Sequence, residues 1–234
     1  MPEQISIGVV IPALNAEKTI CTTIDSVLKF SGGFDIEILI VDGGSTDKTV
    51  CLAKTYGIKV LTSTPNRGQQ LALGASVVSG NWIFFLHSDT TLLDDWNSGV
   101  NEFFDSYEAK RSAGYFLLKF DDESSRAKRL EKFVKWRSKL FGLPYGDQGL
   151  LISRSLYEKI GGFRPMLIME DVDIIRRLTK RRTKRINAHL ETSAIRFKRN
   201  GYLFRSIRKS FLSCVVLYRG SKEIYSPHIR IKIT

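Results

Sequence analysis

The sequence is poor in cysteine and lacks any long apolar segment. Its three cysteines, Cys21, Cys51 and Cys214, are widely spaced and form no Cys-x-x-Cys pair. This odd, scattered set argues against a disulfide framework or a thiolate metal site and favours a reducing compartment. No apolar run reaches the ~18 residues that a transmembrane helix needs. The opening Met-Pro-Glu-Gln-Ile-Ser has no basic residue, so we expect no signal peptide and a cytoplasmic location.

Two further features are absent. No Gly-x-Gly-x-x-Gly follows the first apolar run, which counts against a dinucleotide-binding Rossmann domain. No internal repeat or low-complexity linker divides the 234 residues. We therefore expect a single domain over 1–234, with a basic amphipathic segment at about 196–234.

Positive charge is abundant and unevenly placed. The chain has 36 Lys and Arg against 24 Asp and Glu, a formal net charge of +12. A basic tract opens at 176–185 and continues through Arg208 and Lys209 towards Lys232. This balance favours an anionic partner such as nucleic acid, an acidic membrane surface or a phosphorylated substrate, although a solvated basic face explains it equally well.

Strand and helix patterns alternate along the first third of the chain. Short apolar runs predict strands, and apolar residues at helical spacing predict the helices between them. The strands are expected at 5–11, 37–41, 58–61 and 83–86, and the helices at 20–28, 50–53 and 67–78. This rhythm predicts an α/β, Rossmann-like fold with a mainly parallel central sheet flanked by helices. Pro12 is expected to end the first strand, and Asn15 to cap the first helix.

The later chain continues with helices and strands in turn. Helices are expected at 96–104, 130–137, near Leu156 and from Met169, and strands at 115–120 and 150–153.

Polar residues follow the predicted strands where each one ends. The strand at 83–86 runs into His87, Ser88 and Asp89, and Asp42 ends the strand at 37–41. In an open α/β sheet, these carboxyl ends share the rim where ligands bind. Asp147 and the pair Glu170-Asp171 mark two further loops. Together the acids suggest a divalent cation and a general base beside a phosphorylated ligand.

Each of these residues also has an ordinary explanation. Asp42 and Asp147 are common turn or capping residues. Glu170 and Asp171 suit the first turn of a helix, where acidic groups complement the helix dipole. His87 is explained equally by a satisfied histidine at a strand end.

Several segments together resemble family-2 glycosyltransferases of the GT-A fold. The resemblance rests on 10–17 (VIPALNAE), 40–49 (IVDGGSTDKT), 66–68 (NRG) and 85–89 (FLHSD). The segments 144–149 (PYGDQG), 161–163 (GGF) and 169–173 (MEDVD) look like one bacterial branch, the arsenosugar-biosynthesis or radical-SAM-associated glycosyltransferases. The resemblance covers about 5–190.

The resemblance implies a hexosyltransferase-type enzyme. It would move a sugar from a nucleotide-diphospho-sugar, UDP- or GDP-linked, to the hydroxyl of an unknown acceptor with inversion. Asp171 would be the general base, with Glu170 beside it, and Asp89 would bind Mn²⁺ or Mg²⁺ on the diphosphate. The sugars would meet Asp147 and Gln148. The residues expected to bind the nucleotide-sugar are Pro12, Asn15, Glu17, Asp42, Arg67 and Ser88.

His87 departs from the family pattern, in which an aspartate is common at this position. A neutral imidazole binds hard cations less well than a carboxylate does. His87 is therefore expected either to be a metal ligand beside Asp89, or to contact a donor phosphate or orient Asp89. The need for metal is left open by this substitution.

The segment 203–218 has an amphipathic helical pattern with basic residues beside its apolar stripe. Three interpretations stay open: a helix that closes the core, a helix that contacts an anionic membrane surface, and a homodimer interface. The second would place the protein peripherally on the inner face of the plasma membrane.

Two other functions compete with glycosyl transfer. A sugar-phosphate nucleotidyltransferase also binds a metal-bound phosphate on an α/β sheet, but it usually carries a Gly-rich basic loop that 12–17 lacks. A nucleic-acid-binding protein is supported by charge alone, since no helix-turn-helix, RNP or zinc-finger frame is present, so no specific nucleic acid is expected.

Overall fold

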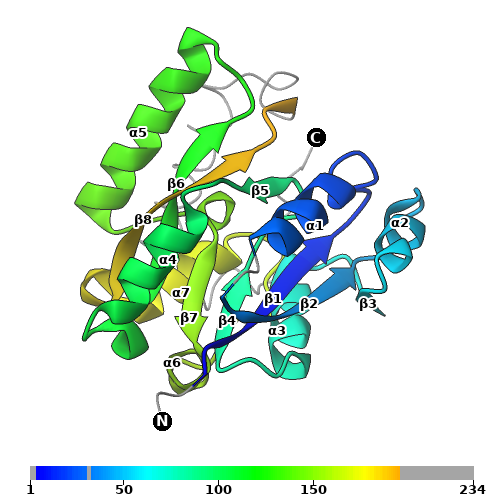
Figure 1. Cartoon of the computed structure of the whole chain (residues 1–234), viewed down its shortest axis with the longest axis horizontal. Coiled ribbons are helices and arrows are strands. Elements are labelled where there is room, and N and C mark those ends of the chain that lie inside the picture. The colour runs from blue at the N-terminus through cyan, green and yellow to red at the C-terminus, as the bar shows by residue number, and fades with distance from the viewer. Residues whose placement is uncertain (1–3, 31–32, 196–234) are drawn as a thin grey trace, which may run out of the picture. The chain divides into compact units, whose positions relative to one another are not determined.

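The computed structural model describes residues 4–30 and 33–195 (Figure 1). The chain divides into two compact units, Met1–Ala194 and Ile195–Thr234, and the account below concerns the first. The amphipathic segment 203–218 lies outside the described residues. The single-domain organisation therefore stays a prediction.

One eight-stranded sheet forms the centre of the described chain, in the order β3-β2-β1-β4-β7-β6-β8-β5 (Figure 1). Its strands are β1 Ser6–Ala13, β2 Asp35–Asp42, β3 Lys59–Thr62, β4 Trp82–Phe85, β5 Thr90–Leu92, β6 Ala113–Phe120, β7 Leu150–Ser153 and β8 Thr183–Thr192.

The α/β class is confirmed, but the sheet is mixed rather than mainly parallel. Four pairs of neighbouring strands are parallel: β3 with β2, β2 with β1, β1 with β4, and β6 with β8. Strand β7 runs antiparallel to both β4 and β6, and β5 antiparallel to β8. The reason lies in the connection. The chain enters β7 from 142–149, beside the carboxyl end of β4, so β7 runs back along β4 in the opposite direction.

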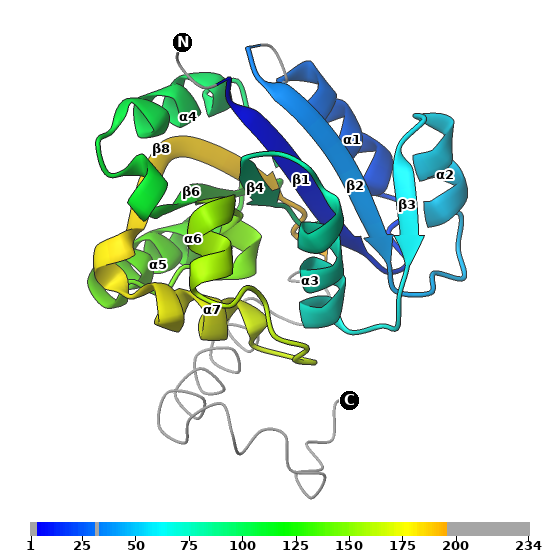
Figure 2. The same ribbon diagram turned by 90° about the horizontal axis from the view of Figure 1, so that it is seen from below.

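Helices cover both faces of the sheet, because strand residues alternate between two apolar clusters. One cluster takes residues of β1 such as Ile7 and Val9 together with α1 Ile20–Lys29, α2 Thr49–Thr55 and α4 Trp96–Asp105. The other takes Val10 together with α3 Arg67–Val77, α6 Arg154–Lys159 and α7 Glu170–Leu178 (Figure 2). The long helix α5 Ser125–Phe141 packs beside β6 and lies at the edge of the molecule in Figure 1. Among the described residues, three short 3₁₀ helices complete the elements: η1 Ala109–Arg111, η2 Gly146–Gln148 and η3 Lys180–Arg182.

Two predictions near the first loop, the end of β1 and the cap of α1, are wrong. Pro12 does not end β1 but lies within it, paired with Val41 of β2. Proline lacks a backbone N–H, and a strand tolerates it where the sheet needs no hydrogen bond from that position. Asn15 does not cap α1. It has a positive φ of 51°, and Thr19 precedes the helix instead. No helix within the described residues is long and apolar enough to cross a membrane.

Candidate functional site

The turn after β4 is held from one side by α1. The amide of Leu86 donates to Val10 O at 3.1 Å, which extends the β1–β4 pairing by one residue. The carbonyl of Ser88 then accepts from Thr19 Oγ1 at 2.7 Å and from Thr23 Oγ1 at 3.1 Å. These two threonines, which the sequence did not single out, fix the backbone between His87 and Asp89.

The same turn is held from the other side by the end of β8. Ser193 N donates to Asp89 O at 3.0 Å, and the hydroxyls of Thr90 and Thr192 lie 2.9 Å apart. Thr192 Oγ1 also reaches the carbonyl of Asp147 at 3.4 Å. The segments that carry Asp89 and Asp147 are therefore joined through the side chains of Thr90 and Thr192.

Asp42 is buried at the carboxyl end of β2 and bonds to its own loop. Its Oδ2 accepts from the amides of Gly44 and Ser45, each at 2.9 Å, and its Oδ1 from Ser45 Oγ at 2.5 Å. Gly44 takes a φ of 91°, which a side chain rarely allows. The turn-residue interpretation of Asp42 is thus realised, and its carboxylate shapes the loop.

The first two loops are joined by side-chain to backbone hydrogen bonds. Asn15 Oδ1 accepts from Thr46 N at 2.9 Å, and Glu17 Oε2 accepts from Lys48 N at 3.2 Å. Asp47 Oδ2 in turn accepts from Glu17 N at 3.1 Å. The loops after β1 and β2 therefore form one rigid polar edge, on which Asn15 and Glu17 lie exposed.

A buried glutamine ties this edge to the sheet. Gln70 of α3 donates through Nε2 to Ala13 O at 3.0 Å and to Val41 O at 2.8 Å, where β1 and β2 end. Sequence reasoning missed Gln70, because only its burial next to two strand ends distinguishes it from any helical glutamine.

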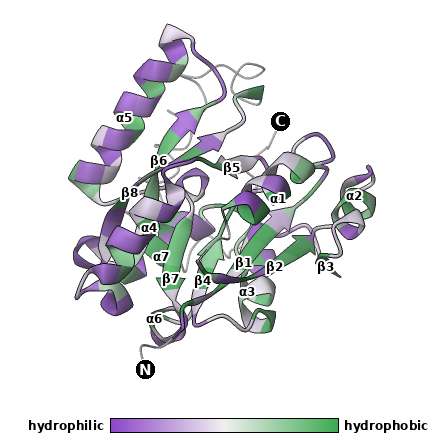
Figure 3. Ribbon diagram, viewed as in Figure 1, coloured by the Kyte–Doolittle hydropathy of each residue, from purple (hydrophilic) through white to green (hydrophobic). Residues whose placement is uncertain are grey.

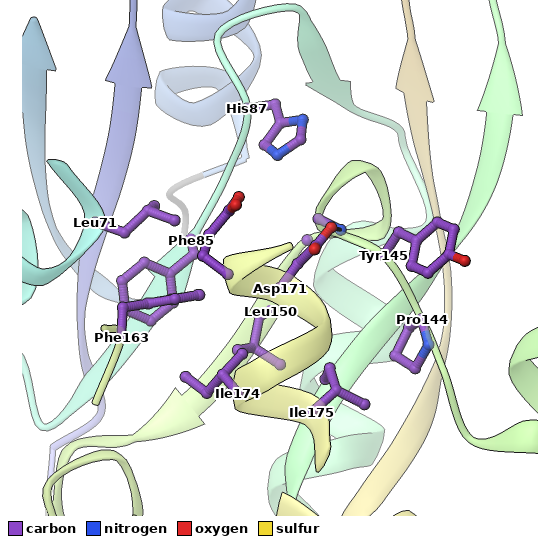
Figure 4. Close-up of a pocket in the computed structure, with 13 residues that line it drawn as sticks. Leu71, Phe85, His87, Pro144, Tyr145, Leu150, Phe163, Asp171, Ile174 and Ile175 are labelled. Atoms are coloured by element: carbon purple, nitrogen blue, oxygen red, sulfur yellow. Dashed lines mark hydrogen bonds between the residues drawn. The ribbon is translucent and has the colours of Figure 1, made fainter. Parts of the chain in front are cut away.

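A narrow pocket opens between the end of β4 and α7 (Figure 4). Its inner wall is apolar, and its rim carries His87, Glu170 and Asp171. Figure 4 shows His87 above the N-terminal end of α7, where Asp171 lies. The cavity of about 30 Å³ holds a few water molecules at most, so a sugar would lie over the rim and not inside. The apolar lining comprises Leu71, Phe85, Leu150, Phe163, Ile174 and Ile175.

Gly146 is the point where the rim groups converge. Its amide donates to Asp171 Oδ2 at 2.8 Å. A Cβ added at Gly146 would lie 2.7 Å from His87 Nε2 and 3.4 Å from Asp171 Oδ2. Only glycine lets the imidazole and the carboxylate approach the same backbone so closely.

An ion pair links α3 to α7 beneath the rim. Arg67 Nε donates to Oε1 of Glu170, whose side chain is only 1% exposed. Burial raises the pKa of Glu170 above its ordinary value, and the charge of Arg67 offsets part of that effect. Burial alone would lower the pKa of the Arg67 guanidinium. The negative charges of Glu170, Asp171 and Asp147 outweigh that effect and raise this pKa. Arg67 therefore lies in the field of all three carboxylates.

The residue that precedes α7 has an unusual backbone conformation. Met169, just before the helix, has φ 63° and ψ 22°, the left-handed region that non-glycine residues seldom enter. Such strain tends to occur at functional sites. The conformation presents Asp171, whose Oδ1 also accepts from Val172 N at 2.8 Å, at the pocket rim.

The residues expected to meet the sugars differ in their surroundings. Gln148 is buried, and its amide is already used: Oε1 accepts from Ser138 Oγ at 2.8 Å and Nε2 donates to Phe116 O at 2.9 Å. These contacts hold η2 against α5 and β6. Asp147 is 8% exposed, and its negative charge helps to raise the pKa of Arg67.

The expected site residues thus fall into two groups. Asp89, His87, Arg67, Glu170 and Asp171 gather around the pocket rim and the turn after β4. The second group forms the edge of joined loops and comprises Pro12, Asn15, Glu17 and Asp42. Within the described residues, no cluster of three or more His, Cys, Asp or Glu side chains could hold a metal ion unaided.

The fold is that of GT-A glycosyltransferases. S. aureus TarS covers 81% of this chain and 60% of its own at a TM-score of 0.63 and 15% identity. Glucosyl-3-phosphoglycerate synthase from Mycobacterium tuberculosis, solved with Mn²⁺, uridine-diphosphate and glucosyl-3-phosphoglycerate, covers 79% of this chain and 70% of its own at a TM-score of 0.58 and 23% identity. At these identities the likeness concerns the fold, and the expected fold is confirmed.

The sequence gives the family. The profile for glycosyl transferase family 2 matches residues 8–168, so the chain belongs to that family. The Mycobacterium tuberculosis synthase is 34% identical over 93 residues, 36% of this chain and 29% of the relative. The match thus spans about a third of the curated relative's length. Family membership does not support the nucleotidyltransferase and nucleic-acid interpretations.

Proposed function

We propose that this glycosyltransferase moves a sugar from a nucleotide-diphospho-sugar to an acceptor hydroxyl with inversion, and that Asp171 is the general base. The observation that carries the proposal is the position of the Asp171 carboxylate. It is fixed by Gly146 N at the rim of a pocket whose other side is the end of β4.

The chemistry of the step needs a carboxylate in that place. The acceptor hydroxyl attacks the anomeric carbon, its proton passes to Asp171, and the bond to the diphosphate breaks on the opposite face. A positioned carboxylate accelerates such a proton transfer by about 10²–10⁴. Glu170 is buried and paired with Arg67. It holds the start of α7 in place and so positions the carboxylate of Asp171.

The donor would lie along the edge of joined loops. Pro12, Asn15, Glu17 and Asp42 form or support that edge, and Ser88 begins the turn beside it. Arg67, which is 39% exposed, adds positive charge for the diphosphate. UDP- and GDP-sugars are the donors we favour, and the Mycobacterium tuberculosis relative was solved with uridine-diphosphate.

A Mn²⁺ or Mg²⁺ ion would be held by Asp89 and His87. Two protein ligands at a strand end suit a cation that takes its remaining ligands from substrate phosphates and water, as Mg²⁺ commonly does. When bound, the cation offsets the charge of the leaving diphosphate.

Several finer assignments belong to the same proposal. The motifs at 144–149 and 169–173 support the arsenosugar or radical-SAM-associated branch. Asp147 would meet the acceptor or donor sugar, and Gln148 would support the loop that carries it. Segment 203–218 would contact an anionic membrane surface or a second copy, which implies a cytoplasmic protein at the inner face of the plasma membrane.

The test is Asp171→Asn, with Asp105→Asn on the exposed end of α4 as the matched control. We expect the donor turnover of the first variant to fall by about 10²- to 10⁴-fold, measured with water or a simple alcohol as acceptor. The variant should still bind the donor. The control should keep wild-type turnover. Unchanged turnover in Asp171→Asn would remove the general-base assignment.

A further inference from the structure

Helix α5 carries a second, outward apolar face. Its inner face buries Ala127, Leu130 and Val134 beside β6. On the outside, Phe133, Trp136 and Leu140 recur at i, i+3 and i+7, which places them on one stripe. All three are exposed, and Trp136 is 52% exposed. An apolar stripe on the solvent side of a helix marks an interaction surface.

The aromatic side chains of this stripe form a continuous patch. The rings of Phe133 and Trp136 lie 6.1 Å apart, and the ring of exposed Phe141 meets that of Trp136 edge-on at 5.6 Å. Figure 3 shows apolar positions along α5 set between hydrophilic ones, whereas the apolar residues of β1 and β4 lie in the core.

A row of lysines runs beside the patch. Lys132, Lys135 and Lys139 follow one another at helical spacing and are exposed. None of the three takes part in an ion pair of the described residues, in contrast to Lys128, which pairs with Glu123 at 2.7 Å. The one acid of the helix, Glu131, is engaged by Phe120 N at 2.8 Å. The outer face is thus apolar and uniformly basic.

We propose that this outer face of α5 binds an anionic phospholipid bilayer. Tryptophan favours the headgroup level, where its ring is apolar and its N–H stays hydrated. Lysines beside it reach the lipid phosphates while their stems cover apolar surface. Helix α5 is a different part of the sequence from segment 203–218, and this proposal does not depend on the proposed reaction.

The proposed face is mechanically joined to the functional site. On the inner side of α5, the guanidinium of Arg137 stacks on the Tyr145 ring at 3.5 Å and donates to Leu143 O at 3.2 Å. Ser138 bonds Gln148. The loop that carries Gly146 therefore lies about one helix diameter, ~10 Å, from the bilayer. An acceptor presented at a membrane surface would be within reach of the pocket rim.

Tryptophan emission tests this surface directly. The chain has three tryptophans, and Trp82 and Trp96 are 4% and 1% exposed in the core. Segment 203–218 contains none. With vesicles of phosphatidylserine and phosphatidylcholine at low salt, we expect sedimentation of the full chain and a shift of its emission to shorter wavelength. High salt should reverse both, and Trp136→Phe should lose the shift while it keeps its unfolding temperature.

Charge variants complete the experiment. The triple variant Lys132→Gln, Lys135→Gln, Lys139→Gln should weaken partitioning by about 10- to 100-fold. The matched control removes the same charge from exposed lysines of other elements, Lys18, Lys54 and Lys59, and should stay within about twofold because distant charges are screened.

Four outcomes would overturn the proposal. These are no sedimentation, sedimentation without an emission shift, equal binding to neutral vesicles, and equal weakening by both triple variants. A concentration-dependent dimer that shifts the emission without lipid would assign the face to a second copy instead. A shift with an oligonucleotide but not with vesicles would assign it to nucleic acid.

Discussion

At the scale of single residues, the site depends on groups that are close together only because one position lacks a side chain. Gly146 lets His87 Nε2 and Asp171 Oδ2 approach the same backbone. The sequence suggested Asp171 and His87 as site residues. It gave no sign that Gly146 lies between them, because this glycine is needed for the space it leaves and not for a positive φ.

Gly146→Ala should therefore impair the reaction more than the fold. The added methyl group must displace the imidazole or the carboxylate, and a shift of about 1 Å can cost about 100-fold in rate. The measurement is donor turnover alongside thermal unfolding. Gly57→Ala is the control, because its φ of 70° makes alanine costly to stability at a place with no neighbour within 4 Å. A variant Gly146→Ala with full turnover would contradict the account.

Glu170 should give stability a distinctive pH dependence. Its folded-state pKa is raised by burial above the ordinary 4.5. The folded protein then holds this proton more tightly than the unfolded chain does, so the contribution of Glu170 is most favourable below pH 4.5 and declines as pH rises through the folded pKa. Urea unfolding should show a free-energy difference between wild type and Glu170→Gln that falls as the pH rises above the ordinary pKa of 4.5. A difference that rises over that pH range would contradict the burial argument.

At the scale of elements, close packing of α3 on the sheet brings Arg67 to the site. Gly74 faces the strands so closely that a Cβ there would lie 2.2 Å from Val10 Cγ1. The helix axis can approach β1 only because that side chain is missing. The same approach places Gln70 on the strand ends and Arg67 beside Glu170.

Gly74→Ala should lower the free energy of unfolding by about 1–3 kcal/mol, despite the better helix propensity of alanine. Val10→Ala removes the clashing methyl groups, so the double variant should be less destabilised than the sum of the two single variants. Chemical denaturation of all four proteins gives the coupling. Strict additivity would show that the helix position does not depend on this contact.

The sequence predicted most elements because their apolar patterns are strong. Strands β1, β2 and β4 are nearly continuous apolar runs, and α7 has a clear helical stripe. Strand β5 was missed because three residues carry too little pattern. Strand β8 was missed because its alternation of buried and exposed residues lies inside a basic tract, where charge drew the interpretation.

The sequence predicted the acids of the site better than their partners. Asp42, Asp89, Asp147 and the pair Glu170-Asp171 were expected at one rim because strand ends and helix starts are visible in the chain, whereas Asp42 bonds within its own loop. The ion pair of Arg67 with Glu170 spans 103 residues, and the bonds of Thr19 and Thr23 to Ser88 O span 69 and 65. Such contacts follow from packing and cannot be read from local pattern.

At the scale of the whole molecule, the chain belongs to glycosyl transferase family 2, and we propose that its donor edge lies on the first two loops and its general base on α7. The two halves meet at the turn after β4, which α1 and the end of β8 hold from opposite sides. Everything proposed for the reaction requires that a nucleotide-sugar and a cation bind together at this turn.

The most direct measurement is therefore the thermal unfolding of the full chain with UDP-, GDP- and dTDP-sugars, each with and without Mn²⁺. At about 100 times its dissociation constant, one donor should stabilise the fold by about 2.7 kcal/mol, a rise of about 5–10 °C. The rise should need Mn²⁺ and vanish in Asp89→Asn, while Asp35→Asn, at the far end of β2, should keep it. A rise without metal that survives in Asp89→Asn would contradict the metal site, and no rise with any donor would contradict the proposed donor site.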